Sequence, residues 1–418
     1  MYQVLYANLN DRYIINELPF VELSWSRVVN ACGSASIKVP LDAGNLRIGK
    51  EIKPGRTAIY ILRDGNFVWE GIAWTWDADL GNNTFNMNCE GIWSYFKHRY
   101  RGYYTAEHLG SVYTAKQRFQ NRIAMDQVIE CLWESADGRW STQIPPDHPA
   151  EDETGALARG YYGDFRGLLQ FKQGKDYAHD EWNWGMKRDR RYWAYEHKQV
   201  AETVEQLAEL RGNVVNPNDD GFDILFETRW ANERDDWDWD PSFPPKPVTI
   251  MRFGNPNGNK NGVILEHGRT AQIEACTADA TNLVDFATTT GAGEGNEMLV
   301  DSLSIDKDGN EHFNEPIPQG MTALETVESY TDVTEDDTLR DKCRNTSRLG
   351  SVPIVIPTVS LIDGGPVDPT MVNVGDLVVV RWNPGFFNIN DWYKVTQMDV
   401  SVADGEECKL TLANAEVF

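Results

Sequence analysis

The strongest constraint in the sequence is a run of strand-forming residues at 57–89, which predicts the closing half of a small antiparallel barrel. Residues 57–62 are β-branched, aromatic or otherwise apolar, as suits a half-buried pleated surface. They lead into Asp64 and Gly65, a pair typical of tight hairpin turns because glycine readily adopts a positive φ. We therefore expect two antiparallel strands joined at this turn.

The returning strand, at 68–80, is long and carries Gly71 in its interior. A glycine at such a place indicates a bend or bulge of the kind that curls a sheet into a barrel. After a Gly-Asn-Asn turn, Phe85, Met87 and Cys89 alternate with polar residues. This alternation predicts a strand with one buried face and one polar face.

A second copy of the arrangement lies near the end of the chain. Residues 377–400 predict two further strands, and 408–412 alternate apolar and polar residues after an Ala-Asp-Gly turn. The segment at 401–405 aligns with the segment at 77–81, since each leads into its closing strand. We interpret the two copies as an internal duplication.

At 418 residues the chain exceeds one typical hydrophobic core, so several domains are expected. We predict a mainly β fold with α+β insertions, in which two similar small antiparallel β-barrel domains carry accessory α+β domains. The predicted domains are an N-terminal β-barrel at 1–100, an aromatic-rich insertion with one helix at 101–195, a small α+β domain at 196–270, a unit of strands, acidic loop and helix at 271–350, and a C-terminal β-barrel at 351–418 completed by strands from 271–300.

Three helices are predicted from apolar spacing. The first covers 118–135 and the second, with the clearest apolar stripe, covers 198–211. The third starts at Thr334, where Asp337 completes a capping pair, and ends at Gly350.

The charge balance argues against nucleic-acid binding. The chain has 39 basic and 64 acidic residues, a formal net charge of −25, so it lacks the basic surface that phosphate contacts require. Many of the acidic residues fall at 294–337, where a solvated acidic face is the plain interpretation. No secretory signal and no apolar run long enough to span a bilayer is found, so no membrane anchor is expected.

No motif for catalysis, a cofactor or a metal stands out. The six cysteines form no CxxC pair and are interpreted as reduced thiols. The glycine-rich segment at 291–295 lacks the spacing of a phosphate-binding loop, and the seven histidines form no HExxH pair. The loops at 216–221 and 306–310 resemble calcium loops but lack the final ligand, so plain turns are expected. We therefore predict no catalytic residue, no cofactor and no metal site.

Two aromatic clusters leave an alternative open. Tryptophan faces beside carboxylates are suited to binding or cleaving a glycan, but tryptophan and tyrosine also anchor protein interfaces and local cores. The clusters consist of Trp182, Trp184, Tyr192 and Trp193, and of Trp230, Trp237 and Trp239 among four aspartates. A glycan-binding or glycan-cleaving protein, or an adaptor for host recognition, is thus the alternative to a purely structural role.

Five segments in order carry a resemblance to a known family. They are residues 69–75, 89–96, 290–295, 339–349 and 374–379. In this order they resemble the tail hub family of phages, which includes the minor tail proteins of siphoviruses of actinobacteria. The resemblance is weakest over 101–195.

The resemblance implies two barrel domains per chain and a homotrimeric ring that joins the six-fold tail tube and distal tail protein to the three-fold tail tip. Its implied partners are other copies of itself, the distal tail protein, the C-terminus of the tape measure protein, and downstream tail-tip or receptor-binding proteins. DNA would pass through without being bound, and part of the acidic excess at 294–337 would face this channel and repel the DNA. The implied location is the virion tail tip, after synthesis in the bacterial host cytoplasm. Longer relatives append a peptidase or glycan-cleaving domain, whereas this chain stops after the second predicted barrel. We therefore carry over no catalytic residue and expect a structural role without enzyme activity.

Overall fold

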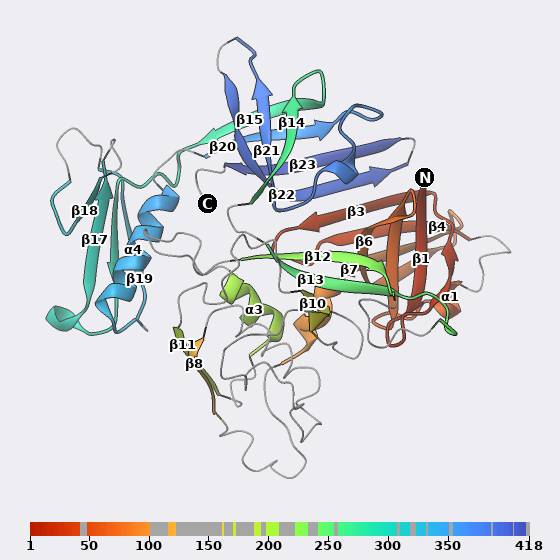
Figure 1. Ribbon diagram of the computed structural model, residues 1–418, viewed down its shortest axis with the longest axis horizontal. Helices are drawn as coiled ribbons and strands as arrows, with labels where there is room; N and C mark the ends of the chain where they lie inside the picture. Colours follow the sequence, from red (N-terminus) through yellow and green to blue (C-terminus); the bar gives the residue numbers. More distant parts are fainter. Residues whose placement is uncertain are drawn as a thin grey trace.

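The structure, a computed structural model, is mainly β with smaller α+β parts (Figure 1). It describes residues 1–41, 48–100, 116–122, 161–162, 170–172, 188–193, 198–208, 222–232, 241–254, 258–306, 310–317, 323–331, 333–350, 354–385, 388–403 and 405–414. Among these residues, no helix is long and apolar enough to cross a membrane.

Strands from both ends of the chain form one large sheet. The early strands are β1 (Tyr2–Asn8), β2 (Ile14–Leu18), β3 (Glu22–Val28), β4 (Ser34–Pro40), β5 (Thr57–Arg63), β6 (Asn66–Asp79) and β7 (Thr84–Gly91). The later strands are β14 (Asn259–Glu266), β15 (Ala271–Asp279), β20 (Ile354–Leu361), β21 (Asp376–Trp382), β22 (Ile389–Val402) and β23 (Glu406–Asn414). The sheet runs in the order β15-β20-β23-β22-β3-β4-β7-β6-β5-β1-β2, and β21 joins it at β22 with β14 on its other side.

The hairpin between β5 and β6 follows from its turn residues. Asp64 and Gly65 both have positive φ, 51° and 82°, which confirms the predicted tight turn. The predicted bulge lies beyond Gly71, because the register of β6 against β7 shifts between Ala73 and Thr75. Gly71 has a different role, since a Cβ there would lie 2.3 Å from the carbonyl oxygen of Glu90. The glycine permits the close approach of β6 to β7.

The topology contains an internal repeat. In the first half the order is β3-β4-β7-β6-β5-β1, and in the second half the order β15-β20-β23-β22-β21-β14 places matching strands at matching positions. The neighbours are antiparallel in both halves except β14 and β21, which are parallel. The duplication inferred from the sequence is thus visible as two strand sets of the same order.

The bulges align the two halves residue by residue. The register of β22 against β23 shifts between Val395 and Gln397, as that of β6 against β7 does between Ala73 and Thr75. Thr396 therefore corresponds to Trp74, and 399–403 corresponds to 77–81. The alignment of 77–81 with 401–405 made from the turns is wrong by two residues, because the connections after the two strands differ in length.

One seam joins the halves. Residues 397–402 of β22 pair antiparallel with 23–28 of β3, so the sheet passes from one half to the other without a break. Figure 1 shows the two halves side by side, with the later strands above the earlier ones. A single hydrophobic cluster includes Trp25 and Phe85 of the first half with Val359 and Leu410 of the second. The halves consequently share one core.

A second hydrophobic core lies on the first half. It brings together η1 (Ile92–His98), α3 (Val200–Ala208), β12 (Asp223–Trp230) and β13 (Pro247–Gly254) with β1, β5 and β6. In α3, Val200, Val204 and Ala208 are buried at helical spacing, which confirms the predicted helix over these residues. Two short strands, β9 (Tyr161–Tyr162) and β10 (Gln170–Lys172), extend the sheet of β12 and β13.

The helix predicted at 118–135 is wrong where it can be compared. Residues of β8 (Lys116–Arg122) form a strand that pairs with β11 (Arg188–Trp193). The partner strand lies about seventy residues away, so the local apolar spacing could not indicate it. The rest of the predicted helix lies outside the described residues.

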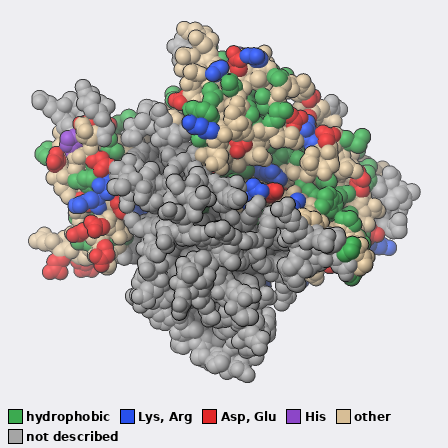
Figure 2. Space-filling view, in the orientation of Figure 1, with side chains coloured by type: hydrophobic (Ala, Val, Ile, Leu, Met, Phe, Trp, Pro, Cys, Tyr) green, Lys and Arg blue, Asp and Glu red, His purple; other side chains and the backbone are tan. Residues whose placement is uncertain are grey.

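A separate α+β unit is inserted between β15 and β20. It contains β16 (Phe286–Thr290), η5 (Gly295–Glu297), β17 (Val300–Ile305), β18 (Glu311–Phe313), β19 (Glu325–Ser329) and α4 (Asp336–Gly350). The helix packs through buried Cys343 on Ala287 and Leu303 of the sheet. Arg340 and Arg344 pair with Asp301 and Glu311 at 3.2 and 3.1 Å and tie the helix to the strands. The acidic stretch at 294–337 belongs to this unit, and Figure 2 shows acidic side chains gathered on it.

Candidate functional site

The sheet presents a continuous polar face across the seam. Alternation along the strands sends Trp25, Cys89, Val400 and Cys408 into the shared core and their polar neighbours to the opposite side. We call this side the polar face. It consists of Glu22, Ser24 and Ser26 of β3, Ser34, Ser36 and Lys38 of β4, Asn86, Asn88 and Glu90 of β7, Asp399 and Ser401 of β22, and Glu407 and Lys409 of β23.

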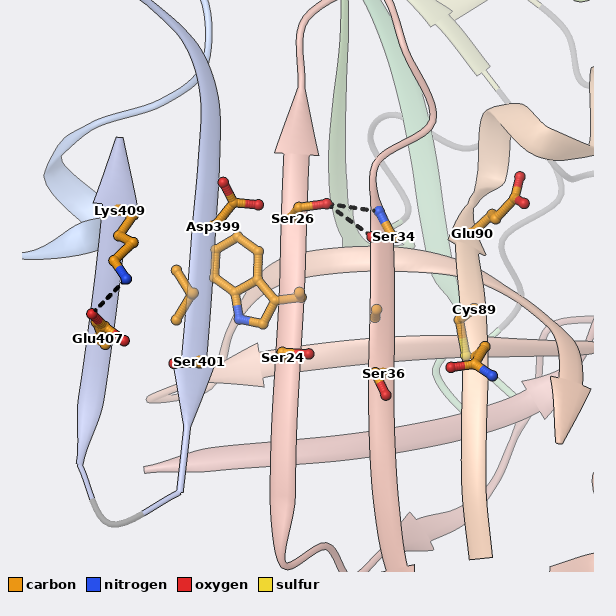
Figure 3. Close-up of a pocket in the computed structure, with 14 residues that line it drawn as sticks. Ser24, Ser26, Ser34, Ser36, Cys89, Glu90, Asp399, Ser401, Glu407 and Lys409 are labelled. Atoms are coloured by element: carbon orange, nitrogen blue, oxygen red, sulfur yellow. Dashed lines mark hydrogen bonds and ion pairs between the residues drawn. The ribbon is translucent and has the colours of Figure 1, made fainter. Parts of the chain in front are cut away.

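A hollow of about 490 Å³ lies on the polar face at the seam (Figure 3). Ser26 and Ser34 face each other there, and their hydroxyl oxygens are 3.1 Å apart. The Glu407 carboxylate forms an ion pair with the Lys409 ammonium group at 2.9 Å. Because three carboxylates and only one ammonium group line the hollow, it suits a surface that repels polyanions better than one that binds them.

Sequence reasoning missed the polar face. The alternation of β7 was recognised, but serines and a few charges on five strands have no motif of their own. Only the pairing of β3 with β22 brings Ser24 and Ser26 beside Ser401 and Asp399. The polar face can therefore be recognised only when β3, near the start of the chain, is known to pair with β22, near its end.

A buried junction lies close to the seam, on the side of the second core. The ammonium of Lys394 in β22 lies 2.8 and 2.7 Å from the two carboxylate oxygens of Asp223 in β12. Asn30, in the turn between β3 and β4, accepts a hydrogen bond from the Ile224 amide at 2.6 Å. Three segments distant in sequence therefore meet through buried polar contacts.

A second buried charge lies close to this junction. Glu70 in β6 is 6% exposed, and Arg27 of β3 lies 3.6 Å from its carboxylate. Burial raises the pKa of Glu70, and the positive charge of Arg27 and a hydrogen bond from Thr228 only partly oppose this rise. The carboxylate thus pays a desolvation cost inside the protein.

An arginine joins the halves at another point. Arg63, at the end of β5, places both terminal nitrogens on the Asp368 carboxylate, at 2.7 Å each, and its Nε 2.9 Å from Glu406 at the start of β23. Such fork geometry is the strong form of an ion pair. Burial alone would raise the pKa of Asp368, but hydrogen bonds from Thr370 and from Arg63 outweigh it and lower the pKa.

The other candidate chemistry of the sequence does not converge on a site. No group of three His, Cys, Asp or Glu side chains suited to a metal occurs in the described part of the chain. The Asp306 carboxylate accepts hydrogen bonds from Asn310 within its own turn, at 2.9 Å from the amide. Gly293 and Gly295 take positive φ in the bend before β17. The loop at 216–221 lies outside the described residues.

Of the tryptophan clusters, Trp230 has a described side chain. Its ring lies edge-on to Phe67, with centroids 4.9 Å apart, and it remains 37% exposed. The ring therefore takes part in local packing between β12 and β6. The side chains of the other clustered aromatics lie outside the described part.

No protein-family model and no curated protein matches this sequence. Solved structures do match in fold. The 43 kDa tail protein of prophage MuSo2 from Shewanella oneidensis aligns with a TM-score of 0.55 and 11% identity, over 99% of this chain and 98% of that one. The tail protein from Neisseria meningitidis MC58 aligns with a TM-score of 0.52 and 10% identity, over 99% and 96% of the two chains. The likeness shows a shared fold over essentially the whole chain.

Proposed function

We propose that the chain is a structural hub protein of a phage tail, three copies of which form a closed ring. The observation that carries the proposal is the internal repeat, because two similar strand sets in one chain allow three copies to present six similar units around an axis. A ring of this kind can face a six-fold tube on one side and a three-fold tip on the other. The two tail proteins that share the fold support this role.

The polar face supplies the channel wall in this proposal. It runs across the seam without interruption, and the hollow on it is lined by serine hydroxyls and an excess of carboxylates. Its two ammonium groups, Lys38 and Lys409, are each paired with a carboxylate of the same face. Carboxylates are in excess on this wall, so the DNA slides past by like-charge repulsion. The protein acts by shape and charge, without catalysis.

The finer assignment follows from the sequence resemblance. We propose a siphovirus-type tail, a place at the tail tip of the virion, and contacts with the distal tail protein, the C-terminus of the tape measure protein and downstream tip proteins. The inserted unit with α4 is a segment available for such contacts. The glycan-binding alternative gains no support from Trp230, since that ring packs on Phe67.

Light scattering and electron microscopy of the purified protein test the function. The expected particle has three times the mass of one chain and appears as a ring of six lobes around a hole. Tails imaged with an antibody against this chain should carry the label at one end. A protein that stays monomeric at every concentration and is absent from assembled tails would contradict the proposal.

A further inference from the structure

The repeat predicts which strand edges join neighbouring copies. In β22, residues 397–402 lie beyond the bulge and have two partners, β23 on one side and β3 on the other. The corresponding part of β6 is 75–80. Residues 75–79 pair with β7 on one side, and within the described part of the chain no strand pairs with them on the other side. The edge that forms the seam in the second half is therefore open in the first half.

The strand that corresponds to β3 is also open. Strand β15 pairs with β20 as β3 pairs with β4, and Ile273 opposite Val359 corresponds to Leu23 opposite Ile37. After a register shift at Glu274, residues 275–279 of β15 correspond to 24–28 of β3. In the described part of the chain this segment pairs with β20 alone, whereas 24–28 pairs with β22 and its first three residues pair with β4 as well.

Burial distinguishes the closed seam from the two open edges. At the seam, Met398, Val400 and Trp25 are at most 4% exposed. Their counterparts on β6 are Trp76, which is 38% exposed, and the exposed Ala78; Leu80, in the turn, is 77% exposed. On β15 the counterparts are half-buried Cys276 and exposed Ala278. Apolar side chains thus stand exposed at the positions that the seam buries.

We infer that β6 of one copy pairs antiparallel with β15 of the next copy and so repeats the internal seam between molecules. This inference rests on the proposed ring and names its contact strands. The register carried over from β22 and β3 pairs Thr75 with Asp279, Trp76 with Ala278, Asp77 with Thr277, Ala78 with Cys276, and Asp79 with Ala275.

The chemistry of the two edges fits this register. The apolar side chains of Trp76 and Ala78 meet Ala278 and Cys276 on the core side. Asp77 and Asp79 meet Thr277 and Ala275 on the side of the polar face, so no two carboxylates stand directly opposite each other. Backbone groups that both edges leave unpaired would be satisfied, and two exposed strand edges would be covered.

Cysteine crosslinking tests the register directly. The native Cys276 is a free thiol, so Ala78→Cys alone creates the predicted cross-strand pair. Opposite residues on antiparallel strands have their Cβ atoms about 4.5–5.5 Å apart, close enough for a disulfide after a small adjustment. Mild oxidation should convert the Ala78→Cys protein into covalent dimers and trimers that reducing agent returns to single chains.

Two controls make the result specific. Ala78→Cys combined with Cys276→Ser should give no covalent oligomer, and Asp77→Cys should give at least tenfold less, because its side chain lies on the other face of the strand. Ala78→Lys provides a second measurement. Since Ala78 is exposed in the single chain, this variant should keep the melting temperature of the single chain, measured below the concentration at which the trimer forms. Its trimer should dissociate at a concentration at least tenfold higher.

The outcomes separate this inference from the proposed function. A trimer by light scattering that forms no Cys276-dependent crosslink overturns the strand assignment and leaves the ring standing. A trimer that crosslinks through Asp77→Cys instead of Ala78→Cys overturns the register. A protein that is monomeric at all concentrations overturns both the ring and the pairing.

Discussion

Lys394 and Asp223 form a buried ion pair, with their side chains only 3% and 2% exposed although 171 residues separate them in sequence. One lies on β22, which is part of the seam, and the other begins β12 of the second core. The contact therefore fixes how the accessory strands sit on the shared sheet.

Removing one partner of this pair should be costly. Lys394→Met leaves the Asp223 carboxylate buried without its counter-charge, and we expect the free energy of unfolding to fall by about 3–5 kcal/mol. The matched control is Lys409→Met, which removes an exposed pair at a similar distance of 2.9 Å and should cost no more than about 1 kcal/mol. Urea unfolding of both variants measures the difference. Equal losses of unfolding free energy in the two variants would show that burial of the ion pair does not determine its contribution to stability.

Gly71→Ala should destabilise the protein. The added methyl group would meet the Trp69 ring at 2.2 Å and the Glu90 carbonyl oxygen at 2.3 Å, so β6 and β7 must separate. We expect a loss of about 1–3 kcal/mol in stability. Gly49→Ala is the control, because its Cβ would meet nothing within 4 Å and its φ is not positive. A neutral Gly71→Ala variant would mean that the strands adjust freely at this point.

Glu70 should make stability depend on pH. Its pKa in the folded protein is raised above the ordinary value of 4.5, mainly by burial, so its contribution is favourable at low pH and is lost as pH rises through the folded pKa. Glu70→Gln removes this titration. The stability of the wild type relative to Glu70→Gln should therefore fall as pH increases above 4.5, as chemical unfolding at several pH values can show. A constant difference would contradict a raised pKa.

Reversing charge on the polar face should create DNA binding. The triple variant Glu90→Lys, Asp399→Lys and Glu407→Lys places cations where three copies would converge on the channel. We expect it to bind a short DNA duplex at low salt, with affinity that falls steeply as salt increases. The control, Asp11→Lys, Glu202→Lys and Asp363→Lys, makes the same charge change at exposed carboxylates outside the polar face and outside 294–337. Fluorescence anisotropy should give at least tenfold weaker binding for the control, and equal binding would argue against a shared channel.

Local features of the fold could be predicted from the sequence, whereas its long-range pairings could not. The turn at Asp64 and Gly65 and the alternation of Phe85, Met87 and Cys89 are properties of neighbouring residues, and the structure confirms them. The helix predicted at 118–135 is wrong at 118–122, because a distant strand, β11, pairs with β8 there. The repeat itself is evident from the sequence, but the alignment of 77–81 with 401–405 is wrong by two residues. The positions of the bulges define the correct alignment, and the composition of the turns does not.

The polar face and the open strand edges depend on long-range strand pairing, so they could not be predicted from the sequence. Ser24 and Ser401 become neighbours only through the pairing of β3 with β22. No local pattern in either segment indicates the other, because each alternates in the same way as every other half-buried strand. Likewise, the exposure of Trp76 indicates an open strand edge only by comparison with Met398, its buried counterpart in the other half.

The shared core has a mechanical consequence. Six consecutive residue pairs at the internal seam and a hydrophobic cluster that passes beneath it bind the halves of one chain into a single rigid block. The inferred contact between copies has five pairs and a smaller apolar side, formed by Trp76, Ala78, Ala278 and Cys276. If the ring must widen to let its contents through, the movement should therefore occur at three of its six joints. The channel would then widen with three-fold symmetry, as three rigid chains move apart at the contacts between copies.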